Sequence, residues 1–388
     1  MQIGKKILLL VSAVLLLSCT GCVQSNTINR RAIVQAIGLD WENGKFSATL
    51  EYFSPSGGSE QPIDAASTNS EFAMGTGLTV SSAIQNAALP KGKIPFYAQS
   101  SILVVGRSLA ERELPKVIDF VNLDADLRVN TEVFIADSKA SDLINPEVNL
   151  GVLPGETIER IYENYYAKGL MPDVEYFKLV NYYYNPYLSC GIPVLRVVDS
   201  PTASSESSGE ETGQTGVSAL PKMPEYVGLG VVREERLSGE LDLVQTRGVL
   251  FLMNEVDRTD LDTVLPDGTP LSVNLIDSET IVHPVLENGK VSFAIRINNT
   301  ANLQEYHPMG YHISEKERKR LVGAIDQLIR QECTQAWEEL MQKQAADLIG
   351  YGNIFRAAYP ERADWMKEHW REILPEITYQ LEIHTKIE

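Results

Sequence analysis

Two cysteines near the start of the chain have the surroundings of residues that accept a lipid. Cys19 and Cys22 follow an apolar run over residues 7–17, and Lys5 and Lys6 precede that run. Basic residues, a short apolar core and small residues before a cysteine are typical of an export signal. Because the run extends across only about half of a ~30 Å hydrocarbon core, we do not expect a transmembrane helix. A thiol in this setting can accept a diacylglyceryl chain, so the sequence predicts a lipoprotein signal.

Either cysteine could be the acceptor. Cys19 has leucine three residues before it and serine directly before it, which is the usual order of a lipobox. Cys22 has glycine directly before it, but a cysteine stands where leucine is expected. We therefore favour Cys19 as the lipid attachment site, with Cys22 as the alternative, and assign residues 1–21 to the signal peptide and lipobox. An ordinary cleaved signal beside a bystander cysteine stays open.

The composition describes a chain that is large enough for several domains but poorly suited to bind polyanions. It has 388 residues, 44% of them apolar, and a formal net charge of -18. A chain of this size and composition can form two or three domains with cores of their own. Because the negative charge repels phosphate groups, we expect no nucleic-acid partner, and the net charge cannot attach the protein to an anionic membrane.

Cysteines outside the signal region are few. Only Cys190 and Cys333 remain there, and this count excludes a disulfide-rich scaffold. Cys333 falls on the apolar stripe of a predicted helix, where a buried free thiol is common. A single bridge between the two residues stays open.

The sequence has no recognisable arrangement of catalytic or metal-binding residues. The histidines are His283, His307, His312, His369 and His384. None has a compact ligand spacing, and we expect the pair at 307 and 312 in a solvated turn. Gly75-Thr76-Gly77 could offer backbone N–H groups to an anion, but we favour an ordinary helix start. We therefore expect a non-enzymatic protein without a metal or cofactor.

The elements that must position these residues alternate between strand and helix in the first half. Asn43-Gly44 supplies the two positive-φ positions of a tight hairpin. The strand after it, at residues 46–52, alternates apolar and polar side chains and is expected to be half exposed. The other predicted segments are a loop at 54–69, helices at 78–89, 109–122 and 156–169, and strands at 100–105, 130–136 and 195–198. This alternation favours helices that cover a sheet.

The second half is predicted to begin with strands and to end with helices and a strand. Residues 200–224 are rich in Ser, Gly and Glu and carry too little apolar surface to fold, so we interpret them as a flexible linker or loop. Ser314 and Glu317 form a capping box for a long helix that ends near Gly350. The other predicted segments are strands at 226–232, 248–253 and 291–297, a hairpin turn at Asn288-Gly289, a helix at 362–373 and a strand at 376–387.

Together these segments predict a mixed α/β, or α+β, protein of two to three domains. The predicted units are an N-terminal α/β domain at 22–199, an acidic linker or loop at 200–224, a mainly β domain at 225–308 and a helix-rich α/β domain at 309–388, in which a long helix packs with strands.

The densest aromatic cluster of the chain is a candidate binding region. It comprises Tyr162, Tyr165, Tyr166, Tyr176, Phe177, Tyr182, Tyr183, Tyr184 and Tyr187. We favour packing beneath a long loop, and a partner-binding surface is the alternative, because aromatic side chains are enriched at interfaces.

Several short segments, taken in order, have a counterpart in a known family. They are RRAIVQAIGLD at 30–40, GRSLA at 106–110, GLGVV at 228–232, LSGEL at 237–241, AADLIGYG at 345–352, and the pair Trp365 and Trp370. None is an active-site signature, so the specificity comes from their order and from their span along almost the whole chain. In these segments the chain resembles the Ger(x)C family, the lipoprotein C subunits of spore germinant receptors.

The resemblance implies a non-enzymatic, lipid-anchored subunit on the outer face of the spore inner membrane. Its partners would be one integral-membrane transporter-like subunit and a second membrane subunit of the same receptor, and its role would be in the response to nutrient germinants. Whether this subunit binds a small molecule itself is left open. The resemblance also implies three mixed α/β domains, with a further division near Met309. The alternative function is a lipid-anchored extracytoplasmic solute-binding protein, which needs a cleft between two lobes.

Overall fold

The structure is a computed structural model. It describes residues 31–53, 70–123, 127–145, 147–148, 153–173, 175–200, 222–306 and 313–388. The predictions for the signal peptide, Cys19, Cys22, the loop at 54–69, His307 and His312, and most of the predicted linker lie outside the described residues.

A large mixed sheet is formed mostly by the first half of the chain. Its nine strands are β1 (Arg31–Glu42), β2 (Lys45–Phe53), β3 (Ser70–Gly77), β4 (Ile94–Phe96), β5 (Ile102–Gly106), β6 (Glu132–Ala136), β7 (Cys190–Asp199), β8 (Lys222–Arg233) and β9 (Arg236–Leu241). The order is β3-β2-β1-β5-β6-β7-β8-β9, and β4 pairs with the start of β1. Strands β1, β5, β6 and β7 are parallel to one another, and antiparallel hairpins continue the sheet on both sides.

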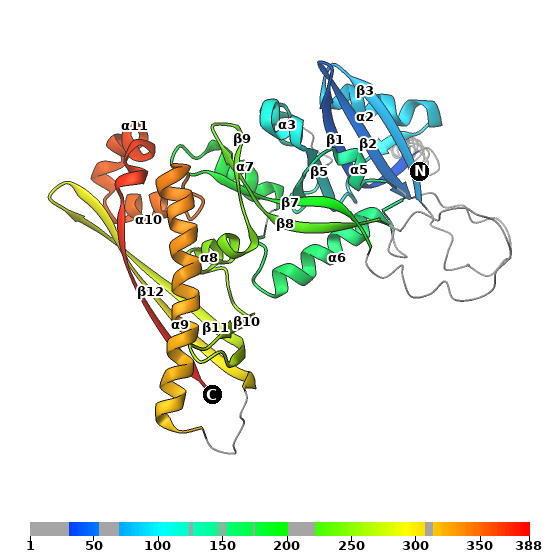
Figure 1. Cartoon of the computed structure of the whole chain (residues 1–388). Helices are drawn as coiled ribbons and strands as arrows, with labels where there is room; N and C mark the ends of the chain where they lie inside the picture. Colours follow the sequence, from blue (N-terminus) through cyan, green and yellow to red (C-terminus); the bar gives the residue numbers. More distant parts are fainter. Residues whose placement is uncertain are drawn as a thin grey trace, which may run out of the picture.

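Helices cover both faces of this sheet (Figure 1). They are α2 (Val80–Ala88), η2 (Leu89–Lys91), α3 (Arg107–Arg112), α4 (Leu114–Leu123), α5 (Ala140–Leu143), α6 (Pro154–Ala167) and α7 (Tyr176–Tyr184). In β5, Leu103 and Val105 join the core under α2, α3, α4 and α7, whereas Ile102 and Val104 join the core under α5 and α6. All four side chains are fully buried, as expected for a parallel strand between two helical layers. The predicted mixed α/β architecture is confirmed.

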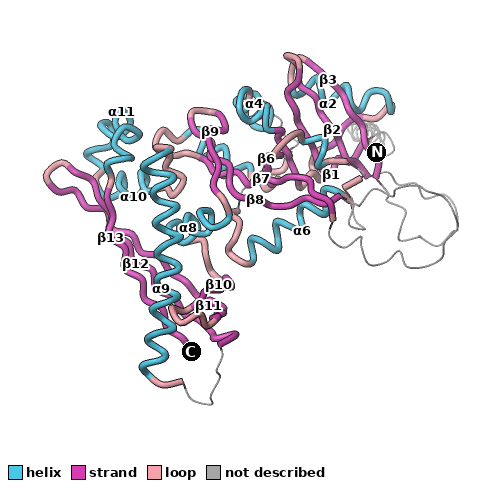
Figure 2. Tube along the Cα trace, in the orientation of Figure 1, coloured by secondary structure: helices cyan, strands magenta, loops and turns pink. Residues whose placement is uncertain are grey.

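A second sheet of four strands is formed by the second half of the chain. Its strands are β10 (Thr259–Val264), β11 (Pro270–Glu287), β12 (Lys290–Tyr306) and β13 (Thr378–Ile387), in that order across the sheet. The helical elements are α8 (Leu243–Met253), α9 (Glu315–Trp337), the π-helical turn η4 (Glu338–Lys343), α10 (Tyr351–Ala358), η5 (Pro360–Arg362), α11 (Ala363–Ile373) and η6 (Leu374–Glu376). Figure 2 shows α9 running beside the long β11–β12 ribbon, with α10 and α11 near its hairpin end. This sheet and the β1–β3 hairpins lie at opposite ends of the molecule (Figure 1).

Both predicted Asn-Gly hairpins are confirmed. Asn43 and Gly44 have φ of 51° and 77°, and β1 pairs with β2 on either side of them. Asn288 and Gly289 have the same φ values of 51° and 77° between β11 and β12. Left-handed backbone at both central residues matches the twist of the flanking strands, which is why the Asn-Gly pair was a reliable signal.

The glycines before α2 serve close packing. A Cβ atom at Gly75 would lie 2.1 Å from the backbone nitrogen of Ala87. Thr79, and not the glycines, caps α2, because its hydroxyl oxygen accepts from the Ser82 N–H at 3.1 Å. The glycine segment therefore allows α2 to lie directly on β3.

Three segments differ from their predictions. The helix predicted at 109–122 is two helices, α3 and α4, because Pro115 has no N–H to donate to the preceding turn. The strand predicted at 248–253 is part of α8, which begins at a capping box between Asp242 and Gln245. Gly350, with φ of 84°, precedes α10 and does not end α9, since the chain leaves α9 through the π-helical turn η4.

The predicted capping box at the start of α9 is half present. The Ser314 hydroxyl oxygen accepts from the Glu317 N–H at 3.2 Å, as predicted. The Glu317 carboxylate instead accepts from the Tyr306 hydroxyl at the end of β12. The side chain that was expected to complete the cap therefore joins α9 to the sheet.

The large sheet continues beyond the predicted linker. Strand β8, which begins at Lys222 near the end of the predicted linker, pairs with β7, and β9 pairs with β8 to complete the sheet. Leu229 and Val231 of β8 belong to the core of the second half, whereas Ile192 and Val194 of β7 belong to the core of the first half. The two cores therefore meet at these strands. The domain boundaries at residues 199, 225 and 309 stay a prediction.

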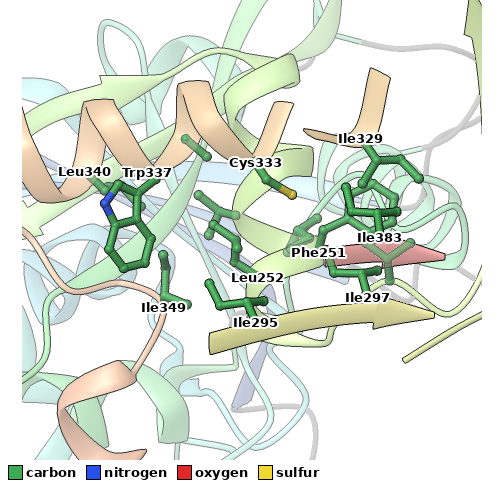
Figure 3. Close-up of a cluster of buried hydrophobic side chains, with 14 of the residues drawn as sticks. Phe251, Leu252, Ile295, Ile297, Ile329, Cys333, Trp337, Leu340, Ile349 and Ile383 are labelled. Carbon is green, nitrogen blue, oxygen red and sulfur yellow. The ribbon is translucent and has the colours of Figure 1, made fainter. Parts of the chain in front are cut away.

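The core of the second half lies between α8, α9 and the small sheet (Figure 3). Trp337 and Cys333 of α9 are fully buried there, and Figure 3 shows the Cys333 thiol among apolar side chains. Cys190 is buried in the other core, and both thiols are free. Arg247 of α8 donates to the Glu332 carboxylate of α9, which is 2% exposed, so the two helices share an ion pair at the margin of this core.

Candidate functional site

The segments that carry the family resemblance converge on two buried carboxylates, and Asp40 is the first. Asp40 lies near the end of β1 and is 5% exposed. Its two oxygens accept from the N–H groups of Ala140 and Ser141 at 2.8 and 3.0 Å, at the start of α5. Burial raises the pKa of Asp40, while these N–H groups oppose the shift. A Cβ atom at Gly106 would lie 2.0 Å from Asp40 Oδ1, so only glycine fits beside this carboxylate.

Arg107 connects this first centre to the end of the sheet formed by β9. Its Nε donates to the Asp137 carbonyl at 2.8 Å, and its Nη2 donates to the Asp137 carboxylate at 2.6 Å. The same Nη2 donates to Glu240, which lies in the LSGEL segment of β9. One guanidinium group thus joins the start of α3 to the loop after β6 and to β9.

Asp347 is the second buried carboxylate, and it organises the AADLIGYG segment. It is 1% exposed and lies between η4 and α10. Its Oδ1 accepts from the N–H groups of Gly350 and Tyr351 at 2.8 and 3.1 Å. Its Oδ2 accepts from the Gly352 N–H at 2.7 Å and from Trp370 Nε1 of α11 at 3.1 Å. A single side chain therefore caps α10 and attaches α11 to it.

Gln344 connects the second centre to the large sheet. Arg233 at the end of β8 donates to the Gln344 carbonyl, and a Cβ atom at Gly239 would lie 2.2 Å from Gln344 Oε1. The Asp347 carbonyl makes a second connection to this sheet, because it accepts from the N–H of Ser189, the residue directly before β7, at 2.9 Å. Gln344 Nε2 also donates to the Glu240 carbonyl at 3.5 Å. We call the set of Asp40, Arg107, Glu240, Gln344 and Asp347 the junction network.

The junction network has the chemistry of a structural joint. Asp347 accepts four hydrogen bonds, about as many as one carboxylate can accept, and Asp40 accepts two from backbone N–H groups while it is 5% exposed. Both carboxylates therefore hold the fold together at this point. In the part of the chain that the structure describes, no group of three or more His, Cys, Asp or Glu side chains is placed to hold a metal ion. The described histidines lie on different elements, with His283 on β11, His369 on α11 and His384 on β13.

The aromatic cluster divides between packing and exposure. Tyr165 packs edge-on against Tyr226 of β8 with ring centroids 5.1 Å apart, and Tyr187 is buried. Tyr166, Phe177 and Tyr184 are instead 49%, 56% and 62% exposed. The cluster lies mostly on helices α6 and α7 and not beneath a long loop as favoured, and its other members are half-buried.

Phe177 and Tyr184 of the aromatic cluster contribute to an exposed apolar patch, whose other two members the sequence did not indicate. Leu123 at the end of α4 is 85% exposed and Val129 in the following loop is 64% exposed. Tyr184 OH accepts from Asn122 Nδ2 at 3.0 Å, and the Phe177 N–H donates to the Val129 carbonyl at 3.4 Å, so α7 lies beside the end of α4 and beside the loop that holds Val129. We call Leu123, Val129, Phe177 and Tyr184 the α4–α7 patch. Clustered exposed apolar side chains of this kind mark interaction surfaces.

Glu51 of β2 shows why the prediction of a half-exposed strand was wrong. The apolar face of β2 is buried as expected, but Thr49 and Glu51 on the other face are 3% and 0% exposed. Glu51 Oε2 accepts from the Gly155 N–H at 2.8 Å, so the start of α6 covers this face. Burial raises the pKa of Glu51 to about 7, although the Gly155 N–H opposes the shift.

We expect the protein to lose stability as the pH rises from about 5 to about 8, and Glu51→Gln to reduce that loss. A carboxyl group whose folded pKa lies above its unfolded pKa stabilises the fold below the unfolded value, and this contribution disappears as the pH passes about 7. One such group contributes at most about 1.4 kcal/mol per pH unit to the slope. Glutamine keeps an oxygen for the Gly155 N–H and cannot ionise.

Urea denaturation at several pH values, followed by tryptophan fluorescence, measures the free energy of unfolding against pH for the parent protein and for Glu51→Gln. Glu132, whose pKa is raised to about 8 mainly by burial, adds a slope of the same sign in both proteins. Glu368→Gln on the exposed side of α11 is the matched control and should leave the slope unchanged. Parallel curves for the parent protein and the Glu51 variant would contradict the expectation.

No helix in the described ranges has the length and apolar character that crossing a bilayer requires.

Comparison with protein families gives two matches in order along the chain. A family model described as "Spore germination protein N-terminal domain" matches residues 24–197, and one described as "Spore germination B3/ GerAC like, C-terminal" matches residues 227–388.

Relatives with similar full-length sequences come from Bacillus subtilis (strain 168). The chain is 21% identical to "Spore germination protein B3" over 384 residues, which covers 96% of this chain and 95% of that protein. It is 20% identical to "Spore germination protein KC" over 403 residues, which covers 98% and 94%. A solved structure, "Crystal Structure of the GerBC protein", superposes with a TM-score of 0.52 at 19% identity and covers 90% of this chain and 96% of that chain. The fold is therefore shared with that protein.

Proposed function

Because the chain belongs to the Ger(x)C family of spore germination proteins, we propose that it is a lipid-anchored, non-enzymatic subunit of a spore nutrient germinant receptor complex. The observation that carries the proposal is the match of the family's N-terminal and C-terminal models to both halves of the chain in order. In this proposal an acyl group on Cys19, or alternatively Cys22, holds the protein on the outer face of the spore inner membrane. The folded part then docks to a transporter-like integral-membrane subunit and to a second membrane subunit.

Two features of the structure support a docking role. Arg233 donates to the Gln344 carbonyl and the Ser189 N–H donates to the Asp347 carbonyl, so hydrogen bonds join the large sheet to the segment before α10. This connection gives partners a single well-defined body to contact. The α4–α7 patch offers exposed apolar surface on one side of that body. It is the first surface to test for contact with the membrane subunits.

The test is recovery of partners from detergent-solubilised spore membranes with the full, acylated chain as bait. We expect two membrane subunits to copurify, and we expect Phe177→Ser with Tyr184→Ser to lower their recovery several-fold and to slow germination in nutrients. Met74→Ser with Val264→Ser changes equally exposed apolar residues, 62% and 63% exposed, and is the control. Equal recovery with both double variants would reject the patch, and absence of membrane partners with the parent chain would reject the proposed function.

A solute-binding role is the alternative, and one cavity favours it. A cavity of about 360 Å³ lies between α7, the β8–β9 turn and α11, with Tyr183, Glu235 and Arg371 among its lining residues. The turn residues Glu234 and Glu235 have φ of 50° and 69°, which is strained for a side chain other than glycine. Calorimetric titration of the protein with amino acids and sugars separates the two functions. Micromolar binding to one of these solutes would favour the alternative.

A further inference from the structure

The end of the large sheet where β1 begins has an unusual rim. Strand β4 pairs in parallel with the first residues of β1, so Arg31 lies opposite Ile94 and Ile33 lies opposite Phe96. The helical turn η2 and Gly92, whose φ is 63°, bring the chain from α2 into β4. The start of β1 and the segment from Leu89 to Phe96 therefore form one continuous surface, which we call the sheet-start rim.

Apolar side chains are exposed on this rim. Leu89 is 66% exposed and Ile94 is 51% exposed, and both belong to the same short connection between α2 and β4. Transfer of an exposed apolar side chain from water into an apolar phase lowers the free energy. The rim therefore has two apolar groups that an apolar phase could accept.

Two cations flank these apolar groups. The Arg31 guanidinium lies over the Phe96 ring at 4.6 Å from its centroid, and the Lys93 ammonium lies over the Tyr52 ring at 4.9 Å. Within the described ranges neither cation forms an ion pair with a carboxylate, although the chain carries an excess of acid. Cations on aromatic rings beside exposed apolar residues are the pattern of an interfacial surface, where phosphate groups and acyl chains are both within reach.

The length of chain before β1 places the rim near any lipid attached upstream. Cys19 precedes Arg31 by twelve residues and Cys22 precedes it by nine. A fully extended segment of that length spans at most about 40 Å. An acyl group on either cysteine would hold the chain at the bilayer, so the rim would meet lipid at a high effective concentration. Even a weak contact between the rim and the bilayer can then form.

We propose that the sheet-start rim is a second membrane contact, an inference that rests on the proposed lipid anchor. Leu89 and Ile94 enter the head-group region, and Arg31 and Lys93 meet lipid phosphates. The occupant is a phospholipid surface. This contact fixes the orientation of the protein, because the small sheet at the opposite end of the molecule then points away from the bilayer (Figure 1).

The test places an environment-sensitive fluorescent amino acid in the full, acylated chain bound to vesicles of phosphatidylglycerol and phosphatidylcholine. The probe stands at position 89 or 94 in separate samples, and at position 243 or 264 as controls, since Leu243 of α8 and Val264 of β10 are 41% and 63% exposed in the second half of the chain. A quencher carried on lipid chains just below the head groups reports contact. We expect several-fold stronger quenching at positions 89 and 94 than at either control, and we expect Arg31→Gln with Lys93→Gln to reduce it.

The outcomes separate this inference from the anchor on which it rests. Protein that sediments with vesicles but is quenched no more at 89 and 94 than at 264 overturns the rim contact and leaves the anchor intact. Protein that does not sediment with vesicles overturns the anchor and the rim contact together. Strong quenching at 89 and 94 that survives the charge replacements supports the apolar contact and rejects the phosphate contact.

Discussion

Replacement of both Cys19 and Cys22 with alanine is expected to move the protein from the membrane fraction to the supernatant and to abolish the nutrient germination response. Each buried methylene of an acyl chain contributes about 0.8 kcal/mol, and stable attachment takes two or more chains. Without a thiol to modify, the remaining contacts must hold a protein with a net charge of -18 on the bilayer. The repulsion between this charge and anionic lipids opposes that attachment.

Membrane fractionation of spores measures this effect, and the single replacements assign the residue. We expect Cys19→Ala alone to release the protein and Cys22→Ala alone to leave it bound. The reverse result would assign the acyl group to Cys22. Mass spectrometry of the N-terminal fragment gives the matching covalent evidence, and a double variant that stayed membrane-bound and functional would show that the anchor is wrong.

Asp347→Ala is expected to lower the free energy of unfolding by about 4–5 kcal/mol, because it removes the acceptor of four hydrogen bonds at a buried position. Three backbone N–H groups at the start of α10 and the Trp370 indole N–H would be left without a partner. Asp347→Asn should be nearly as damaging, since its amide group would present a donor to one of these N–H groups.

Urea denaturation monitored by the buried tryptophans, Trp337 and Trp370, measures the loss. Asp119→Ala removes an exposed carboxylate of α4 and is the matched control, with an expected change of about 0.5 kcal/mol or less. A loss below about 1 kcal/mol for Asp347→Ala would show that the surrounding N–H groups find other partners.

Elements fixed by neighbouring residues were predictable from the sequence. The turns at Asn43 and Asn288 require left-handed backbone, which Asn-Gly supplies, and the cap at Ser314 uses the N–H group three residues later. Segments buried on all sides were not predictable in this way. The apolar run at 248–253 fits a strand or a helix equally well by its pattern, and the deciding cap at Asp242 lies outside the run.

The junction network could not be derived from the sequence because its contacts join distant residues. Asp40 bonds the N–H group of a residue 100 positions later, and Arg107 bonds Glu240 133 positions later. The resemblance to the family picked out most of these residues, but it gave no contacts between them. Glu51 was missed for a related reason, since alternation in β2 indicates one buried face and cannot show that α6 covers the other.

Strand β8 has a consequence for how the chain can be divided. A fragment that stops at Asp199 would leave the outer side of β7 without its hydrogen-bonding neighbour over its whole length. Such an unprotected edge strand is a template for aggregation. The complementary fragment would lose the β7 partner of β8 and the first-half core in which Val232 and Leu237 are buried. We therefore expect both pieces to misassemble, so truncation at this point would not test the role of either part, and a tag is better placed after Glu388.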